Sequence, residues 1–203
     1  MTELWQHSAL ELAAAIRDGD TTSRAVVEAH LARIDAVNGH LNAVVRRLDE
    51  TALEAADEAD AAIARGDRIG TFHGVPMTVK ENIDLLGSPT TEGLVAFANE
   101  MPTLDAPVCE RMKAAGAIPI WRTNLPDLGL RVSTDSSLHG LTRNPHHPGR
   151  TAGGSSGGEA SAIASGMSPL GLGNDIGGSL RNPAHCCGIA SLKPSIGAVP
   201  AAS

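Results

Sequence analysis

The sequence predicts an α/β fold, because stretches with helical periodicity alternate with short apolar stretches typical of strands. The helical signals are strongest in residues 1–66. The strand signals are strongest in the segments GVPMTVK and AIPIWRTN. A length of 203 residues is sufficient for one domain with a hydrophobic core.

The first helix is predicted to begin after Ser8. Ser8 and Glu11 form an S-x-x-E capping-box pattern, in which each side chain bonds the other residue's backbone N–H. Gly19 is expected to end this helix.

Two further helices are predicted before residue 67. Thr22 or Ser23 is expected to cap the second helix, which carries an apolar stripe made of Val27, Leu31 and Ile34. The third helix is rich in Ala and Glu, and it is expected to run from about Thr51 to Arg65, with Gly66 as its stop.

The middle of the chain predicts strand, helix and strand. Val75, Met77 and Val79 alternate with other residue types and indicate a short strand. Asp105 is expected to cap a helix that has Pro107 in its first turn and ends at Gly116. The residues of this helix that are expected to face inward are Val108, Met112 and Ala115. The segment AIPIWRTN then predicts a buried strand.

The last third is expected to be rich in turns and glycine. Residues 126–154 show no regular period. The segment EASAIASG predicts a helix of small residues, and SPLGLGND predicts a strand that runs into a glycine-rich turn. Pro183 is expected to open one more short helix after Asn182.

Composition excludes several classes of protein. Hydrophobic residues make up 42% and charged residues 19%, which is typical of a globular chain, and the formal charge of −7 argues against a nucleic-acid surface. No apolar run reaches the roughly 18 residues that a membrane helix needs, and the N-terminus lacks the features of a signal peptide.

The cysteine and histidine patterns predict no disulfide framework and no metal site. Cys109, Cys186 and Cys187 are odd in number and two of them are adjacent, which fits a reducing cytoplasm. No CxxC or HxxxH spacing occurs, and His146 and His147 are interpreted as loop residues. We therefore expect no metal and no organic cofactor.

The segment TAGGSSGGEA, residues 151–160, allows four interpretations. A flexible linker would usually be longer and lie between domains, and a phosphate-binding loop would need a lysine after the glycines. A nucleophile elbow matches G-x-S-x-G at Ser155 and at Ser156, but it requires a preceding strand that NPHHPGRTA cannot form. The fourth interpretation pairs this loop with a second glycine loop.

The second loop, GNDIGGSLRNP, supplies a candidate nucleophile. Its Gly-Gly-Ser run ends at Ser179, and such a run leaves backbone N–H groups free to converge on an anion. If Ser179 attacks a carbonyl, the N–H groups of Ile176, Gly177, Gly178 and Ser179 itself can hold the oxyanion. One such donor contributes roughly 2.7–4 kcal/mol in the transition state.

Lys80 is the candidate base for this serine. It follows the apolar run GVPMTV, and burial there would disfavour its ammonium and lower its pKa. Taken alone, Lys80 is most simply a strand-end lysine with its charge in solvent. Together with two serine loops it indicates the serine–lysine variant of triad catalysis.

These segments resemble the amidase signature family of serine hydrolases. The similar segments are GGSSGGEASAIASGMSPLGLGNDIGGSLRNPAHCCGIASLKPS, HGVPMTVKENID, GAIPIWRTNLPDLG and TTSRAVVEAHLARIDAVNGHLNAV. They cover nearly the whole chain. The resemblance implies a three-layer α/β/α fold with a mixed central sheet, truncated here at the C-terminus relative to the longer family members. Residues 1–203 would form one amidase domain, with a helical segment at 1–66 and a catalytic core at 67–203.

The resemblance also implies a role for each site residue. Ser179 matches the acyl-accepting nucleophile, Lys80 the base, and Ser155 the serine between them, which follows a cis peptide bond in the family. Gly154 would suit that bond, and Ser156 would support the lysine or the loop. Asp175 and Arg181 would brace the nucleophile loop.

This chain departs from the family pattern at two positions and in length. Ala152 stands where many relatives have Pro, and Asn174 where Thr is common. The C-terminal part that the family has after this point would supply further strands and much of the acyl pocket. Apolar surface exposed there would favour aggregation or pairing, and a homodimer is one form of such pairing.

The expected function is hydrolysis of linear carboxylic amides, with ester hydrolysis as a side activity, on a small-molecule substrate in the cytoplasm. No nucleic-acid or membrane partner is expected. Two alternatives remain open. One is the glutaminase component of a tRNA-dependent amidotransferase, its A subunit, and the other is a catalytically inactive fragment with a structural or interaction role.

Overall fold

A four-stranded mixed sheet lies at the centre of the computed structural model, which describes residues 3–200. The strand order is β1-β3-β2-β6, in which β2 is parallel to β3 and to β6, and β1 is antiparallel to β3. The strands are β1 Val44–Arg47, β2 Pro76–Lys80, β3 Ile118–Thr123 and β6 Gly171–Leu172. A separate two-stranded ribbon consists of β4 Asp135–Ser136 and β5 Gly140–Leu141.

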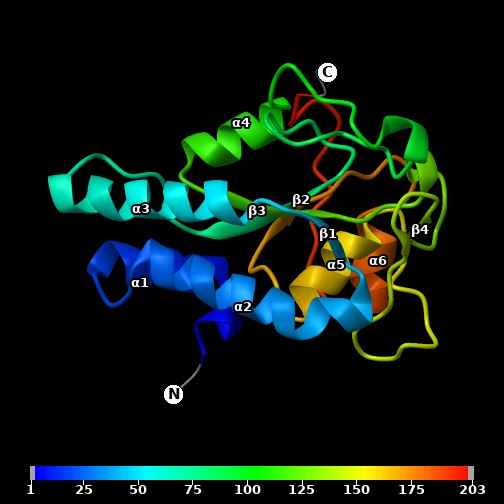
Figure 1. Cartoon of the computed structure of the whole chain (residues 1–203), viewed down its shortest axis with the longest axis horizontal. Helices are drawn as coiled ribbons and strands as arrows, with labels where there is room; N and C mark the ends of the chain where they lie inside the picture. Colours follow the sequence, from blue (N-terminus) through cyan, green and yellow to red (C-terminus); the bar gives the residue numbers. More distant parts are fainter. Residues whose placement is uncertain (1–2, 201–203) are drawn as a thin grey trace.

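Helices cover both faces of the sheet, so the expected α/β/α layering and mixed sheet are confirmed. In Figure 1, α4 lies above the sheet, and α1, α2, α5 and α6 lie below it. The helices are α1 Ala9–Asp18, α2 Ser23–Leu41, α3 Asp49–Arg65, α4 Pro107–Ala114, α5 Gly157–Ala164 and α6 Arg181–Cys187. Three short 3₁₀ turns are η1 Leu4–Gln6, η2 Val95–Phe97 and η3 Asp127–Gly129.

The first three helices begin and end close to the residues that the sequence predicts. Ser8 and Glu11 form the complete capping box of α1, and the Thr22 side chain accepts the Ala25 N–H at the start of α2. Gly19 and Gly66 end α1 and α3 in the left-handed conformation. Because capping is a local interaction, sequence alone was sufficient to find these ends.

Strand β1 was not predicted. It lies inside residues 1–66, which were expected to be helical, and it adds an antiparallel edge to the sheet. Its sequence is VVRR, so two charged residues obscure the strand pattern. Both arginines have partners from elsewhere in the chain, since Arg46 pairs with Glu81, and Arg47 pairs with Asp35 and lies over the Trp121 ring.

Strand β2 is buried along its whole length, although its sequence alternates. Met77 and Val79 pack in one apolar cluster with Cys109 of α4. Thr78 and Lys80 face the other way, toward α5, because side chains alternate across a strand. A central strand between two helical layers thus buries its polar residues as well as its apolar ones.

Two predicted helix starts were wrong. Asp105 does not cap α4, whose N-cap is Ala106; its carboxylate instead accepts the Leu86 N–H and pairs with Lys113. The last helix begins at Arg181, two residues before Pro183, and Pro183 is buried in its first turn. Among the residues of α4 only Cys109 is fully buried, because it faces the sheet directly.

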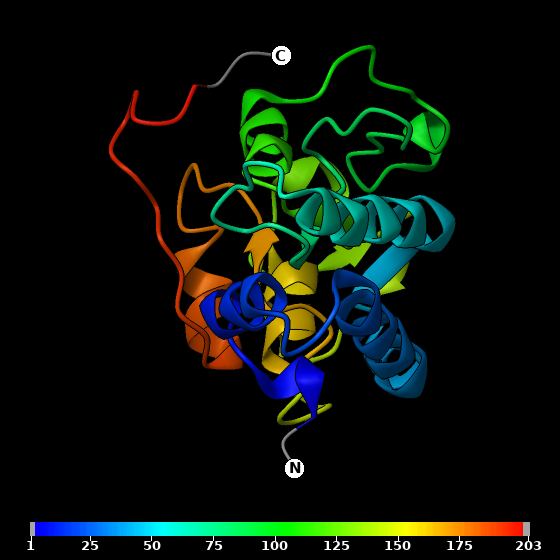
Figure 2. The same cartoon turned by 90° about the vertical axis from the view of Figure 1, so that its left-hand side faces the viewer.

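Beyond α6 the chain runs along the outside of the molecule, as the red segment in Figure 2 shows. Apolar side chains are exposed in this segment, and Ile196 is 100% exposed. Among residues 3–200, no helix has the length and apolar character required to cross a membrane.

Candidate active site

Lys80 ends strand β2, and its side chain is completely buried. Its Nζ lies 2.7 Å from Ser155 Oγ and 2.6 Å from Asn174 Oδ1. Lys80 and Ser155 are 75 positions apart in sequence. The carboxyl ends of parallel strands in an α/β sheet lie at one edge, where such residues converge.

Burial lowers the pKa of Lys80 to about 8, because removal from water disfavours the ammonium. The carboxylates of Glu92, Glu159 and Asp175 oppose this effect. A substantial fraction of Lys80 is therefore neutral near pH 8, and a neutral amine can accept a proton.

Ser155 is almost completely buried beside Lys80, and the Gly154–Ser155 peptide bond is cis, as the family resemblance implies. Position 154 has no room for a side chain. A Cβ there would lie 2.5 Å from the Arg131 carbonyl oxygen and 2.8 Å from the Ser133 nitrogen. This close approach of two backbone segments gives Gly154 a packing reason to be glycine.

Ser156 connects the two glycine loops. Its backbone N–H donates to the carbonyl of Ser179 over 3.1 Å, and its hydroxyl donates to the carbonyl of Asn174 over 3.3 Å. Ser156 is also the N-cap residue of α5. The structure thus brings the second glycine loop against the first.

Asp175 organises the loop that carries Ser179. Its carboxylate accepts the N–H groups of Gly178, at 2.7 Å, and Leu180, at 3.0 Å, and it forms a two-point ion pair with Arg181. The hydrogen bond from Arg181 and the backbone N–H groups hold the pKa of Asp175 well below its usual range. Asp175 therefore connects Arg181 to the backbone of this loop.

The expected oxyanion donors are only partly available. The Gly178 N–H was expected to bind the oxyanion, but it donates to the Asp175 carboxylate and is not free to do so in this arrangement. The N–H groups of Ile176, Gly177 and Ser179 make no hydrogen bond within residues 3–200. The Ser179 hydroxyl likewise has no hydrogen-bond partner in that range, so its expected contact with Ser155 is absent here.

Glu159 is a site residue that the sequence analysis missed. Its carboxyl group is buried in α5 and accepts hydrogen bonds from Thr78 and Thr123. Burial raises the pKa of Glu159 to about 7, against the effect of those hydrogen bonds and of Lys80. The sequence did offer a signal for Glu159, which is the single charged residue in the predicted helix of small residues.

Asn174 was noted as a departure from the family pattern, but its contact with Lys80 was not anticipated. Its side chain also donates to Asn82 Oδ1 over 3.0 Å. Asn82 follows directly after Lys80 and Glu81, so proximity to the candidate base was the signal that sequence offered.

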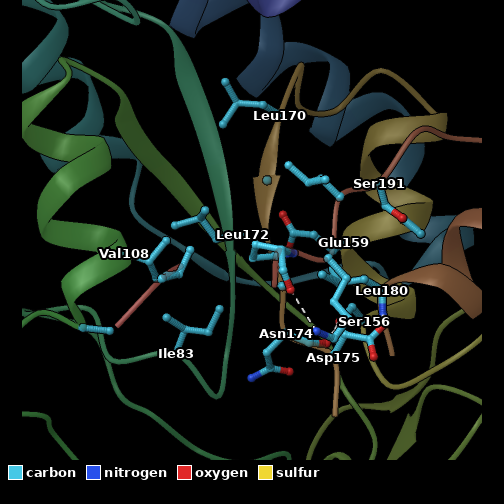
Figure 3. A pocket seen from close by; sticks show the side chains of 18 of the residues that line it. Ile83, Val108, Ser156, Glu159, Leu170, Leu172, Asn174, Asp175, Leu180 and Ser191 are labelled. Carbon is cyan, nitrogen blue, oxygen red and sulfur yellow. Dashed lines mark hydrogen bonds between the residues drawn. The ribbon is translucent and has the colours of Figure 1, made fainter. Parts of the chain in front are cut away.

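A cavity of about 1030 Å³ lies beside these loops. In Figure 3, apolar side chains including Ile83, Val108 and Leu172 lie on one side, and Ser156, Asn174 and Asp175 on the other. Residues 189–197 of the C-terminal segment contribute to the wall. The candidate catalytic residues Lys80, Ser155 and Ser179 do not line this cavity, although their neighbours Ser156, Asn174 and Leu180 do.

No metal centre is formed among residues 3–200, since no cluster of three or more His, Cys, Asp or Glu side chains has suitable geometry. Cys109, Cys186 and Cys187 are free thiols. Burial raises the pKa of Cys109 to about 11 and that of Cys187 to about 12, which makes both poor nucleophiles.

Comparison with known proteins gives consistent matches. The model of the family described as Amidase matches residues 25–203. Indoleacetamide hydrolase from Bradyrhizobium diazoefficiens is 52% identical over 198 residues, which are 98% of this chain and 38% of that protein. Acylamidase from Rhodococcus erythropolis is 39% identical, over 98% of this chain and 42% of that protein.

Two further matches extend the range of related activities. The A subunit of glutamyl-tRNA(Gln) amidotransferase from Lachnospira eligens is 40% identical, over 97% of this chain and 41% of that protein. The structure of peptide amidase from Stenotrophomonas maltophilia superposes with a TM-score of 0.83 at 30% identity, covering 88% of this chain and 38% of that one. The chain thus spans about two fifths of the length of the curated relatives that it matches.

Proposed function

The chain belongs to the Amidase family, and from that premise we propose that the full-length protein hydrolyses a carboxylic amide through an acyl-enzyme on Ser179. In this proposal Lys80 is the base and Ser155 relays protons between Lys80 and Ser179. The observation that carries it is the 2.7 Å contact between Lys80 Nζ and Ser155 Oγ in a buried site. A lysine whose pKa is lowered to about 8 can act there as a base.

The first half-reaction forms the acyl-enzyme. Ser179 Oγ attacks the amide carbon while its proton passes to Ser155 Oγ, and the Ser155 proton passes to neutral Lys80. The free N–H groups of Ile176 and Gly177, with that of Ser179, stabilise the negative oxygen. Collapse of the intermediate breaks the C–N bond, and the proton returns from Lys80 through Ser155 to the departing nitrogen, which leaves as ammonia or an amine.

The second half-reaction releases the acid. Water attacks the acyl carbon and gives its proton through the same relay to Lys80, and the C–O bond to Ser179 then breaks with return of that proton to Ser179 Oγ. The Ser155–Ser179 contact must form for both half-reactions. We assign its formation to substrate binding, since catalytic hydrogen bonds often tighten only in the complex.

Indoleacetamide is the first substrate to test, because the 52%-identical relative is named for its hydrolysis. A second candidate is the glutaminase reaction of an amidotransferase, supported by 40% identity to the A subunit of such an enzyme. The two candidates differ in one respect that can be measured. An indoleacetamide hydrolase is expected to act alone, whereas the glutaminase is expected to need its partner subunits.

A serine-directed fluorophosphonate tests the acyl-enzyme directly. The full-length protein is incubated with the reagent, and the adduct is located by mass spectrometry. We expect the adduct on Ser179, its loss in Ser179→Ala, and wild-type labelling in the control Thr103→Ala, which removes an exposed hydroxyl in the segment before α4 and outside the cavity wall. Folded protein that carries no adduct on Ser179 would refute the proposed function.

We extend the proposal to a cytoplasmic protein that acts on a small molecule and is able to form a homodimer. The three free thiols suit a reducing compartment. Sedimentation of the full-length protein measures its mass in solution, and cell fractionation with an antibody measures its location.

A further inference from the structure

Besides Ser155, Lys80 contacts a line of polar side chains that leads through Asn174 and Asn82 to Glu92. We propose that Glu92, Asn82 and Asn174 are positioning residues that hold the Lys80 amine in the orientation needed to accept the Ser155 proton. This inference rests on the proposed function and assigns to these three residues a part in the same reaction.

The direction of each hydrogen bond in the line is fixed by chemistry. An amide oxygen can only accept, so Asn174 Oδ1, at 2.6 Å, must take an N–H from Lys80. The Asn174 amide nitrogen then donates to Asn82 Oδ1 over 3.0 Å. The Asn82 side chain lies close to the Glu92 carboxyl group, and their interaction favours the charged carboxylate.

The Asn174 contact determines where the reactive electron pair of Lys80 can point. Neutral Lys80 has two N–H bonds and one lone pair in tetrahedral positions. Because one N–H is held by Asn174, the position that faces Ser155 Oγ at 2.7 Å is available for the lone pair. After proton transfer the same position carries the new N–H, so the amine need not turn between the two states.

Asn174 can connect Lys80 to Asn82 because its amide group carries both an acceptor oxygen and a donor nitrogen. Threonine, which is common at this position in the resembling family, has one hydroxyl, so a single oxygen would have to accept from Lys80 and donate to Asn82. Asn174 makes these two contacts from two separate atoms, Oδ1 and the amide nitrogen. The departure noted in the sequence therefore spans a longer distance than the shorter threonine side chain can.

Glu92 lies close to the reactive groups. It adopts a left-handed backbone conformation with φ of 51°, which is uncommon for a residue other than glycine. Its carbonyl accepts the N–H of Leu128, which is followed by Gly129, and a Cβ on Gly129 would lie 3.4 Å from Ser155 Oγ. Glu92 thus lies next to the loop that covers Ser155.

Other charged groups surround Lys80 but are bonded elsewhere. From α5, Glu159 is held by Thr78 and Thr123, and from the nucleophile loop, Asp175 is paired with Arg181. The neighbouring Glu81, which follows β2, turns away to Arg46 and His139, and Arg122 of β3 bonds to backbone carbonyls and Ser88. Glu92 is the carboxylate that the line of amides joins to Lys80.

The test is the pH profile of Ser179 labelling by the fluorophosphonate in the full-length protein. Asn174→Thr and Asn82→Ala should each lower the high-pH plateau by between about tenfold and about a hundredfold, because the amine loses its fixed orientation. Glu92→Gln keeps the shape of the side chain, and it should move the midpoint to lower pH, since the carboxylate favours the ammonium. Glu100→Gln, an exposed carboxylate in the same loop, is the matched control and should leave both quantities unchanged.

The double variant Asn82→Ala/Asn174→Thr separates a connected line from independent effects, because each single variant is expected to lower the plateau. A connected line predicts a plateau no lower than that of Asn174→Thr alone, because the line is already broken. Multiplicative losses in the double variant, or wild-type plateaus in both Asn174→Thr and Asn82→Ala, would overturn the inference. Thermal unfolding of each variant shows whether it is folded. If the wild type itself is not labelled on Ser179, the proposed function fails, whereas labelled wild type with unaffected variants rejects only the positioning role.

Discussion

The two halves of the candidate site differ in how deeply their side chains are buried. The half that carries the candidate base is enclosed, since Lys80 is 0% exposed and Ser155 only 2%, and both are held between β2 and α5. The half that carries the candidate nucleophile is open, since Ile176 is 101% exposed and the Ser179 hydroxyl has no hydrogen-bond partner within residues 3–200. The Lys80–Ser155 contact is therefore fixed by the packed fold, whereas the Ser179 loop is held mainly by the Asp175 carboxylate.

The largest expected effect comes from removing the enclosed base. Lys80→Met keeps the length of the side chain but cannot accept a proton, so labelling of Ser179 should slow by about 10²–10⁴-fold. The variant should fold, because an apolar side chain suits a fully buried position. Lys113→Met, which removes a partly exposed lysine that pairs with Asp105, is the control. A loss of less than a few-fold in folded Lys80→Met would show that the enclosed half is not the source of the base.

The pH dependence of Ser179 labelling should reflect the pKa of Lys80, which lies in the enclosed half. Only neutral Lys80 accepts a proton, so labelling should rise with pH and be half-maximal near the lowered Lys80 pKa of about 8. Between the plateau and pH 6 the rate should fall about a hundredfold, because two pH units below a pKa leave about 1% of the neutral form. Stopped-flow or quenched labelling at fixed ionic strength measures the profile. A midpoint near the ordinary lysine value of about 10.4 would mean that burial does not tune this group.

A smaller effect is expected in the open half. Asp175→Asn removes the charge that orients the Gly178 and Leu180 N–H groups, and the plateau rate should fall about tenfold. Arg181→Gln should cost less, because its side chain is 59% exposed and an exposed ion pair contributes little. The plateau rates of the two variants are compared by measuring Ser179 labelling above pH 9. Equal losses in the two variants would show that the ion pair, rather than the backbone contacts of Asp175, orders the loop.

The smallest effect is expected where the loop after β3 approaches the enclosed half. Gly129→Ala would bring a methyl group to 3.4 Å from Ser155 Oγ, and labelling should slow a few-fold. Gly140→Ala is the matched control, because Gly140 also has a positive φ, of 76°, but no atom within 4 Å of the added methyl. Both variants should lose similar stability by thermal unfolding, since each strains a left-handed position. Equal labelling rates would show that Gly129 does not limit the space beside Ser155.

Local sequence signals predicted local structure well. The capping box at Ser8, the stop at Gly66 and the strand Ile118–Thr123 follow from interactions within a few residues or from an uninterrupted apolar run. The failures occurred where a distant partner outweighed a local preference. Asp105 is a good cap by sequence, but in the structure it bonds to Leu86 and Lys113 instead. The arginines of β1 resemble a surface segment, yet pairing with β3 makes that segment a strand.

In the candidate site, too, short motifs indicated the residues, whereas contacts between distant residues were not predicted. The sequence indicated Lys80, Ser155 and Ser179 through their motifs, together with Asp175 and Arg181 as flanking braces. It did not indicate that the Gly178 N–H would be used by Asp175, that Glu159 would be buried against Thr78 and Thr123, or that Asn174 would contact the lysine.

The sequence by itself determined the order of most helices and strands, the family resemblance and the choice of candidate catalytic residues, because these depend on residue type and short spacing. The tertiary structure alone decided which groups meet. Lys80 contacts Ser155 across 75 positions and Asn174 across 94, through the packing of α5 and the β6 loop against β2. Such contacts depend on strand register and layer packing, which arise from the burial of many residues at once, and that burial also lowers the pKa of Lys80 to about 8.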